Sequence, residues 1–157
     1  MDVFWSELTF GLPDSAQLTR IIIRLVASAL IAGLIGYQRQ AAGKSAGFRT
    51  HILVSLGATI FVIAGLGAGL EHADLSRIIQ GIVTGIGFIG AGTILKDGLH
   101  VRGLTTSAGL WATCAIGVVV GLGELGIALI AGTVVFVILT FAKWIDHEID
   151  KQDHTTN

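Results

Sequence analysis

Four polar side chains border apolar runs of this chain and are of types that handle cations or protons. Asp74 or Ser76 can cap a helix that starts near them, and Gln80 enters an apolar run where its amide needs a hydrogen-bond partner. We predict an outer-leaflet polar cluster of Arg24, Asp74, Arg77 and Gln80. Two roles stay open for this cluster: helix capping with a structural ion pair, or a site where an ion or proton enters. In the second role, Asp74 is the candidate metal ligand, because Mg²⁺ prefers carboxylate oxygens.

A second group of candidate residues is basic and lies in a segment that we expect to face the cell interior. The segment from Tyr37 to Thr50 holds Arg39, Lys44 and Arg49, contains no acid, and ends in the hydroxyl of Thr50. These cations can fix the membrane topology and touch anionic lipid. They can also form a docking surface for a cytoplasmic partner or an anionic ligand. The topological role is favoured on physical grounds.

A second inside segment carries Arg102 and the two hydroxyls of Thr105 and Thr106. The pair Asp97-Gly98 predicts a turn in this segment. The threonine hydroxyls can satisfy free amides at the start of the next helix or bond across helices. Trp111 follows one to two turns deeper, and we expect it to pack rather than to bind a ligand.

Two motifs resemble nucleotide-binding loops, but their surroundings exclude that function. The stretch from Gly85 to Gly90 matches GxGxxG inside an apolar run, whereas the nucleotide fingerprint follows a strand. Gly43-Lys44-Ser45 lacks the glycine five positions earlier, where Gln38 stands. Cys114 is expected to be a small buried residue.

The remaining polar residues predict neither an enzyme nor a cofactor. The five histidines are expected to be solvated in loops, at span ends or in the tail: His51, His72, His100, His147 and His154. They have no metal-ligand spacing, and no nucleophile stands beside a base. The net charge of −1 gives no support for a nucleic-acid partner.

The elements that position these residues are predicted to be transmembrane helices. Charged residues make up 13% of the 157 residues, against about 25% in an ordinary soluble domain. Apolar runs of about 18 residues or more are candidate membrane spans. We predict an all-α, polytopic bundle with five spans, at about 18–38, 52–70, 78–95, 104–121 and 125–142. Arg20 and Arg24 fall in the first span, and their long side chains are expected to reach back to the headgroups.

The distribution of Lys and Arg predicts the orientation N-out, C-in. With the N-terminus outside, the inside segments hold seven of the ten basic residues, and the outside segments hold Arg20 and Arg77. Residues 1–17 are then a short extracytoplasmic segment, 18–142 the transmembrane domain, and 143–157 a cytoplasmic polar tail. The acidic start of the chain is unlike a signal peptide, so we expect the first span to stay in the mature protein.

Glycine is unusually frequent, at 22 residues of 157. Membrane helices use small residues spaced four apart to let their backbones approach closely, and such pairs include Gly117/Gly121 and Ala128/Gly132. Five glycines of the third span form the densest group: Gly81, Gly85, Gly87, Gly90 and Gly92. We therefore predict that the third span is the central helix, crossed tightly by its neighbours; local unwinding to line a cavity is the less favoured alternative.

Three motifs in order resemble those of the MgtC/SapB family of bacterial inner-membrane proteins. They are the stretches from Gly36 to Gly57, from Gly85 to Gly92, and from Val101 to Thr106 followed by Leu110-Trp111. The resemblance covers nearly the whole hydrophobic chain and implies a five-helix membrane domain. It also matches Asp74, Arg77 and Gln80 to a family motif. Many members have an acid where this chain has Gln38, and many carry a soluble C-terminal domain, which we do not expect here.

The family resemblance implies a link to growth under magnesium limitation and, in pathogens, to survival inside host cells. It implies regulation of other membrane proteins, including the ATP synthase. We therefore expect a non-enzymatic regulator that acts through small-residue helix faces in the lipid bilayer, with self-association as an open possibility. The alternative is a transporter or channel for Mg²⁺ or another cation. Apart from Arg20 and Arg24 near the outer end of the first span, the predicted spans carry no charged side chain, which argues against an ion path.

Overall fold

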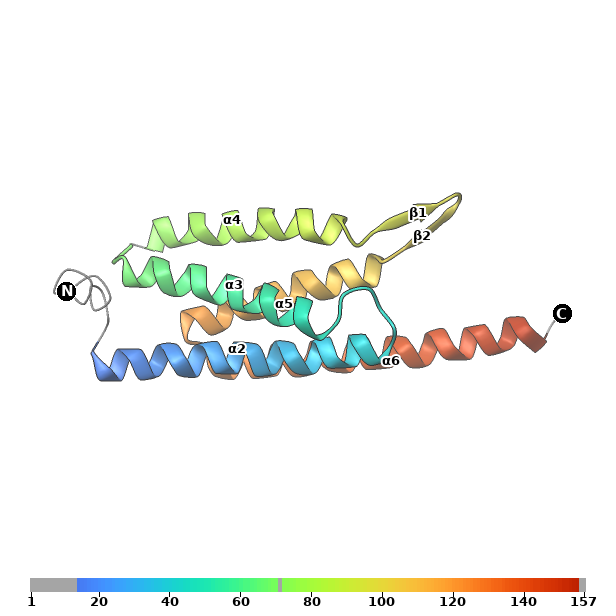
Figure 1. Cartoon of the computed structure of the whole chain (residues 1–157), viewed down its shortest axis with the longest axis horizontal. Helices are drawn as coiled ribbons and strands as arrows, with labels where there is room; N and C mark the ends of the chain where they lie inside the picture. The colour runs from blue at the N-terminus through green and yellow to red at the C-terminus, as the bar shows by residue number, and fades with distance from the viewer. Residues whose placement is uncertain (1–13, 71, 156–157) are drawn as a thin grey trace, which may run out of the picture.

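The computed structural model describes residues 14–70 and 72–155, with the backbone alone for residue 72 and for residues 142–155. The described chain is a bundle of long helices with one short hairpin (Figure 1). The helices are α2 (Ser15–Ala41), α3 (Phe48–Gly67), α4 (His72–Ala91), α5 (Leu104–Leu122) and α6 (Leu125–Thr155). The strands β1 (Leu95–Asp97) and β2 (His100–Arg102) join α4 to α5. The predicted all-α class is confirmed.

Three of the described helices are long and apolar enough to cross a membrane: α2, α3 and α5. Helix α6 contributes a shorter apolar stretch, Leu125–Phe141, and continues as a helix to Thr155 through the predicted tail. Each predicted span falls on one helix, but α4 begins at His72, before the predicted start at 78, and α6 continues past the predicted end at 142. That all five cross the bilayer, and in which direction, stays a prediction.

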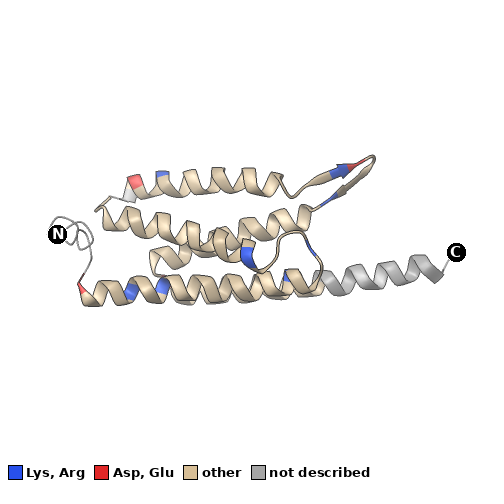
Figure 2. Cartoon of the chain, in the orientation of Figure 1, with Lys and Arg blue, Asp and Glu red and all other residues tan. Residues whose placement is uncertain are grey.

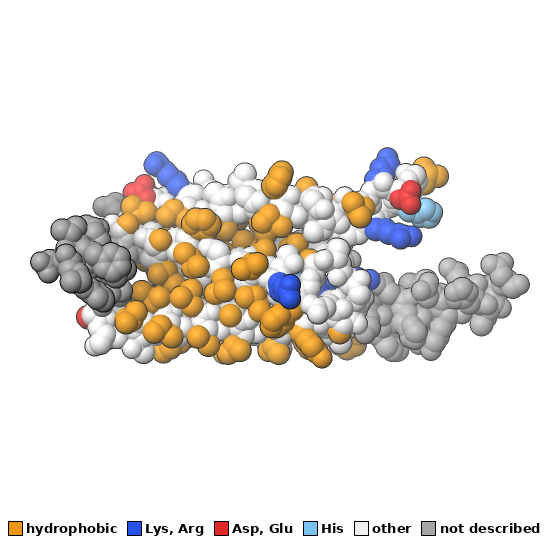
Figure 3. Space-filling model, in the orientation of Figure 1, with side chains coloured by type: hydrophobic (Ala, Val, Ile, Leu, Met, Phe, Trp, Pro, Cys, Tyr) orange, Lys and Arg blue, Asp and Glu red, His pale blue; other side chains and the backbone are white. Residues whose placement is uncertain are grey.

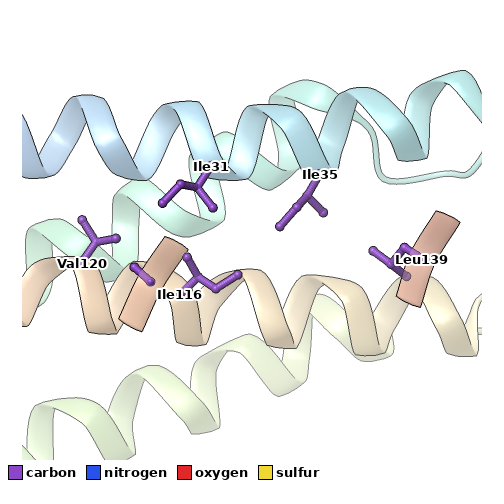
Figure 4. Close-up of a cluster of buried hydrophobic side chains, with 6 residues drawn as sticks. Ile31, Ile35, Ile116, Val120 and Leu139 are labelled. Atoms are coloured by element: carbon purple, nitrogen blue, oxygen red, sulfur yellow. The ribbon is translucent and has the colours of Figure 1, made fainter. Parts of the chain in front are cut away.

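Helices α3 and α5 occupy the middle of the bundle, where α3 packs on both α2 and α5 (Figure 1). Helix α6 lies along α2 and α5, and their apolar faces meet in one core cluster. Figure 4 shows Ile31 and Ile35 of α2 pointing toward Ile116 and Val120 of α5, with Leu139 of α6 beside them. This cluster fixes the position of α2 against the helices that follow it late in the chain.

A second core cluster joins α3, α4 and α5. It consists of Ala58, Val62, Leu75, Ile86, Cys114 and Val118. The predicted buried position of Cys114 is confirmed, since 5% of the residue is exposed. Helix α4 is held by this cluster on one side only, so it lies at the edge of the bundle (Figure 1).

The prediction that the third span is the central helix is therefore wrong. A Cβ atom added to Gly81, Gly85 or Gly87 of α4 would find nothing within 4 Å. Gly90 does permit a close approach, because a Cβ there would lie 2.6 Å from Ser107 Oγ of α5. The density of glycines along a helix does not decide which helix is central, because the fold can leave a small-residue face without a neighbour.

The closest approach of two helices is instead made by α5 on α3. A Cβ on Gly117 would lie 2.9 Å from Ser55 Cα and would overlap the Ser55 carbonyl oxygen. One turn later, a Cβ on Gly121 would lie 2.7 Å from Val62 Cβ. This pair has the predicted four-residue spacing, and the absence of both side chains brings the two backbones together.

The hairpin after α4 extends beyond the bundle (Figure 1). Its strands pair antiparallel, with Asp97 opposite His100, and Gly98 turns the chain with φ of +58°. The predicted turn at Asp97-Gly98 is confirmed, but the strands on either side of it were not foreseen. Their side chains are exposed, so no apolar alternation marks them in the sequence.

The outer surface of the bundle is largely apolar (Figure 3). Leu34 of α2, Leu53 of α3 and Ile130 of α6 are each 65–69% exposed. Charged side chains lie toward the two ends of the described bundle (Figure 2). An apolar exterior between two charged ends is the arrangement that a lipid bilayer accommodates.

Candidate functional site

The first predicted basic segment forms a tightly closed connection between α2 and α3. A Cβ on Gly36 would lie 2.8 Å from Phe48 Cα and 3.0 Å from His51 Cβ, so only glycine lets the start of α3 approach α2 so closely. The Gln40 side chain accepts a hydrogen bond from the Phe48 backbone N–H at 3.3 Å. Gln40 thus satisfies one of the free amides at the start of α3.

The basic residues of this connection are not all on its surface. Arg39 is only 2% exposed and lies inside the last turn of α2, where a cation is favoured by the helix dipole. Its assignment to a docking surface is therefore wrong. Lys44 and Arg49 are exposed and Thr50 is half-buried, so these three remain accessible to lipid or to a partner.

His51 is fully buried, so the prediction that loop water solvates it is wrong. Its Nδ1 atom lies 2.9 Å from the Thr113 hydroxyl of α5. Because that hydroxyl donates to the Gly109 carbonyl at 2.8 Å, it accepts a hydrogen bond from Nδ1–H of His51. The tautomer inferred from this network leaves Nε2 as an acceptor, and within the described residues Nε2 has no hydrogen-bond partner.

Three further buried hydroxyls tie α2, α3 and α5 together. Ser28 Oγ of α2 lies 2.8 Å from Ser55 Oγ of α3. Thr59 Oγ1 lies 2.9 Å from Ser28 Oγ and 2.8 Å from the Gly117 carbonyl oxygen of α5. Sequence reasoning missed this network, although His51, Ser55 and Thr59 follow one another at intervals of four residues. That spacing places them on one face of α3 and could have revealed the network.

The predicted outer polar cluster is divided between two places. Arg77 Nη1 lies 3.5 Å from Asp74 Oδ1 on the surface of α4, and Gln80 is exposed one turn later. Arg24 Nη1 instead donates to the Gly121 carbonyl at 2.8 Å, at the end of α5. Among the described residues, Asp74 and Arg77 are the only members of the cluster bonded to each other. This arrangement matches the structural ion pair better than a metal site built on Asp74.

The predicted residues of the second inside segment differ in their exposure. Arg102 in β2 and Thr105 at the start of α5 are exposed, whereas Thr106 is buried. Trp111 is 54% exposed on the outside of α5, so its predicted packing role is not found within the described chain. Gly92 ends α4 and borders only the carbonyls of its own last turn.

An apolar groove runs between α3 and α4. It has a volume of about 530 Å³ and is floored by Cys114 of α5. Phe61 lies on its α3 side, and Gly57, Gly81 and Gly85 are positions on its walls that carry no side chain. A Cβ on any of these three glycines would meet nothing within 4 Å. The groove is therefore open to a partner that packs on helix backbone.

Comparison with known proteins agrees with the helical bundle and its three motifs. The model of the MgtC family matches residues 25–148, which include all the helices described above except the start of α2 and the end of α6. The chain belongs to the MgtC family. This membership confirms the resemblance seen in the motifs, and with the three apolar helices it marks the chain as a membrane protein.

Curated relatives of this MgtC-family chain come from several bacteria. YhiD of Escherichia coli K12 is 48% identical over 115 residues, which are 68% of this chain and 54% of YhiD. Protein MgtC of Salmonella typhimurium LT2 is 42% identical over 114 residues, 73% of this chain and 48% of that protein. Protein MgtC of Brucella abortus is 45% identical over 109 residues, 68% of this chain and 44% of that protein. The chain thus spans about half the length of these relatives. No solved structure matches it.

Proposed function

We propose that this chain is a non-enzymatic regulator of other membrane proteins, and that the groove between α3 and α4 receives a transmembrane helix of its target. In this proposal the chain sits in the bacterial inner membrane with five spans, N-terminus out and C-terminus in. Its physiological role is adaptation to magnesium limitation and, in a pathogen, survival inside host cells. The ATP synthase is the candidate target that the family resemblance suggests.

The observation that carries this proposal is that the space beside the glycines of the groove is empty within the described chain. Helices associate in lipid by van der Waals packing, because lipid tails compete equally well for apolar side chains. Close approach of two backbones is therefore the main source of attraction, and it requires small residues. Gly81 and Gly85 of α4, with Gly57 of α3, offer that approach and make no such contact within the described residues.

The proposed orientation is supported by the ends of the bundle. The start of α3, with Arg49, and the hairpin, with Lys96 and Arg102, lie at one end of the bundle, while the starts of α2 and α4, with Arg20 and Arg77, lie at the other (Figure 1). The end with the connection from α2 to α3 and the hairpin is then cytoplasmic under the positive-inside rule.

Transport of magnesium is the second candidate, because YhiD of Escherichia coli K12 is provisionally named as a magnesium transporter. Asp74 is the carboxylate that would serve an ion at the outer end, and it pairs with Arg77 on the surface of α4. Mg²⁺ flux into liposomes that contain the purified chain, read by a trapped dye, separates the two functions. Flux that falls in Asp74→Ala would favour transport, and absence of flux from inserted protein would favour regulation.

The docking experiment compares two glycines of the same helix. Leucine in place of Gly85 would fill the groove, whereas leucine in place of Gly87 would project from another side of α4 that does not line it. Neither site has a neighbour within 4 Å, so both variants should fold. Each variant would be tagged, expressed under magnesium limitation in cells lacking the native chain, and tested for copurification with the ATP synthase membrane sector and for growth.

We expect Gly85→Leu to lose both the target and the growth phenotype, and Gly87→Leu to keep both. Equal behaviour of the two variants would refute docking in the groove. If the wild-type chain captures a second, differently tagged copy and Gly85→Leu abolishes that capture, the groove serves self-association and the regulatory proposal fails.

A further inference from the structure

A second cleft lies between the N-terminal part of α2 and the C-terminal part of α3, away from the groove that binds the proposed target. Its volume is about 570 Å³. Two arginines, Arg20 and Arg24, line it from α2, and Ile63, Ala64 and Leu66 line it from α3. The cleft therefore combines cationic side chains on one wall with an apolar opposite wall.

Arg24 is held in place by the end of α5. Its Nη1 donates to the Gly121 carbonyl at 2.8 Å. Gly123, with φ of +93°, makes room for the guanidinium, since a Cβ there would lie 2.5 Å from Nη2. The half-buried guanidinium uses one of its five N–H donors in this bond, and it faces the cleft with its position already fixed.

Arg20 stands one turn before Arg24 and is exposed, so its guanidinium is able to turn toward the same cleft. Gln17 lines the cleft one turn earlier still. Among the described residues that line the cleft, the one acid is Asp14, which caps α2 by accepting a hydrogen bond from the Gln17 backbone N–H at 2.7 Å. In this described lining the two arginines therefore outnumber the acid.

Arg20 lies near the depth of the lipid headgroups, and Arg24 lies deeper. With 27 residues, α2 is about 40 Å long and exceeds the hydrocarbon core of about 30 Å by about 5 Å at each end. Arg20 then lies close to the boundary of the hydrocarbon, and Arg24 lies about one turn inside it. A cation in a membrane span is costly unless it has a partner, so an anion in this cleft would stabilise both arginines.

We propose that this cleft binds one anionic phospholipid. The phosphate accepts hydrogen bonds from Arg20 and from the free N–H groups of Arg24, and an acyl chain lies against Ile63, Ala64 and Leu66. Arginine suits this ligand because its planar fork binds phosphate oxygens in pairs. A free phosphate ion shares the headgroup chemistry but gains nothing from the apolar wall.

The test measures lipid affinity with the full chain purified in a neutral detergent. Phosphatidylglycerol or phosphatidylcholine would be titrated in, and bound lipid counted by native mass spectrometry. We expect the wild type to prefer phosphatidylglycerol and Arg20→Gln to weaken its binding about fivefold, the effect of one basic residue at a membrane surface. Arg20 is exposed, so its replacement leaves the packing intact.

Arg77→Gln is the matched control, because Arg77 is an exposed arginine of α4 that does not line the cleft. It should keep the wild-type affinity. Equal affinity of the wild type for the two lipids, or no loss in Arg20→Gln, would overturn the proposal. An equal loss of lipid affinity in Arg77→Gln would show that the effect depends on the overall charge and not on the cleft, and it would also overturn the proposal. Displacement of the lipid by inorganic phosphate at the same concentrations would assign the cleft to a free ion instead.

Discussion

Replacing Gly117 by alanine should destabilise the bundle more than alanine at any other glycine of α5. The new Cβ would overlap the Ser55 carbonyl oxygen and lie 2.9 Å from Ser55 Cα. Both atoms belong to the backbone of α3, so no side-chain rotation relieves the contact and the two helices must separate. Such overpacking costs about 1–3 kcal/mol.

Separation of the helices would also weaken the bond between Thr59 and the Gly117 carbonyl, now 2.8 Å long. Hydrogen bonds between membrane helices contribute about 0.6 kcal/mol on average. The free energy of unfolding should therefore fall by roughly 2–4 kcal/mol in total. The measurement is reversible unfolding in mixed micelles, in which dodecyl sulfate is added to protein in a mild detergent and helix content is followed by circular dichroism.

The matched control is Gly81→Ala, which adds the same methyl group to a helix interior where nothing lies within 4 Å. Its free energy of unfolding should stay within about 0.5 kcal/mol of the wild type. If Gly117→Ala proved as stable as Gly81→Ala, α5 and α3 would not be in the close contact described here, and the central position of α5 would have to be abandoned.

Three further substitutions probe the buried contacts in the same unfolding assay. Thr59→Val keeps the side-chain shape but removes the hydroxyl between α2, α3 and α5, and should cost about 1–2 kcal/mol; a stable variant would show that the hydroxyl network contributes nothing. Thr113→Val leaves His51 Nδ1 buried without its partner and should cost about 1–3 kcal/mol, unlike the exposed Thr133→Val. Gly103→Ala should cost at least about 1 kcal/mol, because φ is +91° and a Cβ would overlap the Thr93 carbonyl, whereas Gly126→Ala should be neutral.

The positions of the helices could be predicted from the sequence because they depend on local composition. Runs without charge mark α3 and α5 to within a few residues, and Asp97-Gly98 marks the turn of the hairpin. The relative positions of the helices could not be predicted in the same way. Which helix covers which depends on contacts between segments far apart in sequence, and the glycines of α4 indicated the wrong helix as the centre.

The candidate site was predicted only in part, because contacts between distant segments decide which of its residues are buried. His51 looked like a loop residue because it precedes the apolar run of α3, yet it is fully buried, with Gly36 of α2 and Thr113 of α5 against it. Arg39 looked like a surface cation, yet it is buried in the last turn of α2. Asp74 and Arg77 are three residues apart on one helix, and that pair could be anticipated because its geometry is local.

The position of α4 at the edge of the bundle has a consequence for how the protein opens. A helix held on one side only belongs to the part of a fold that detaches at the smallest free-energy cost, while α2, α3 and α5 share buried hydroxyls and backbone contacts that resist separation. Amide hydrogens of α4 should therefore exchange with solvent deuterium before those of α3. A partner that enters beside Gly81 and Gly85 would then widen its own binding site by displacing one helix, while the other described helices stay folded.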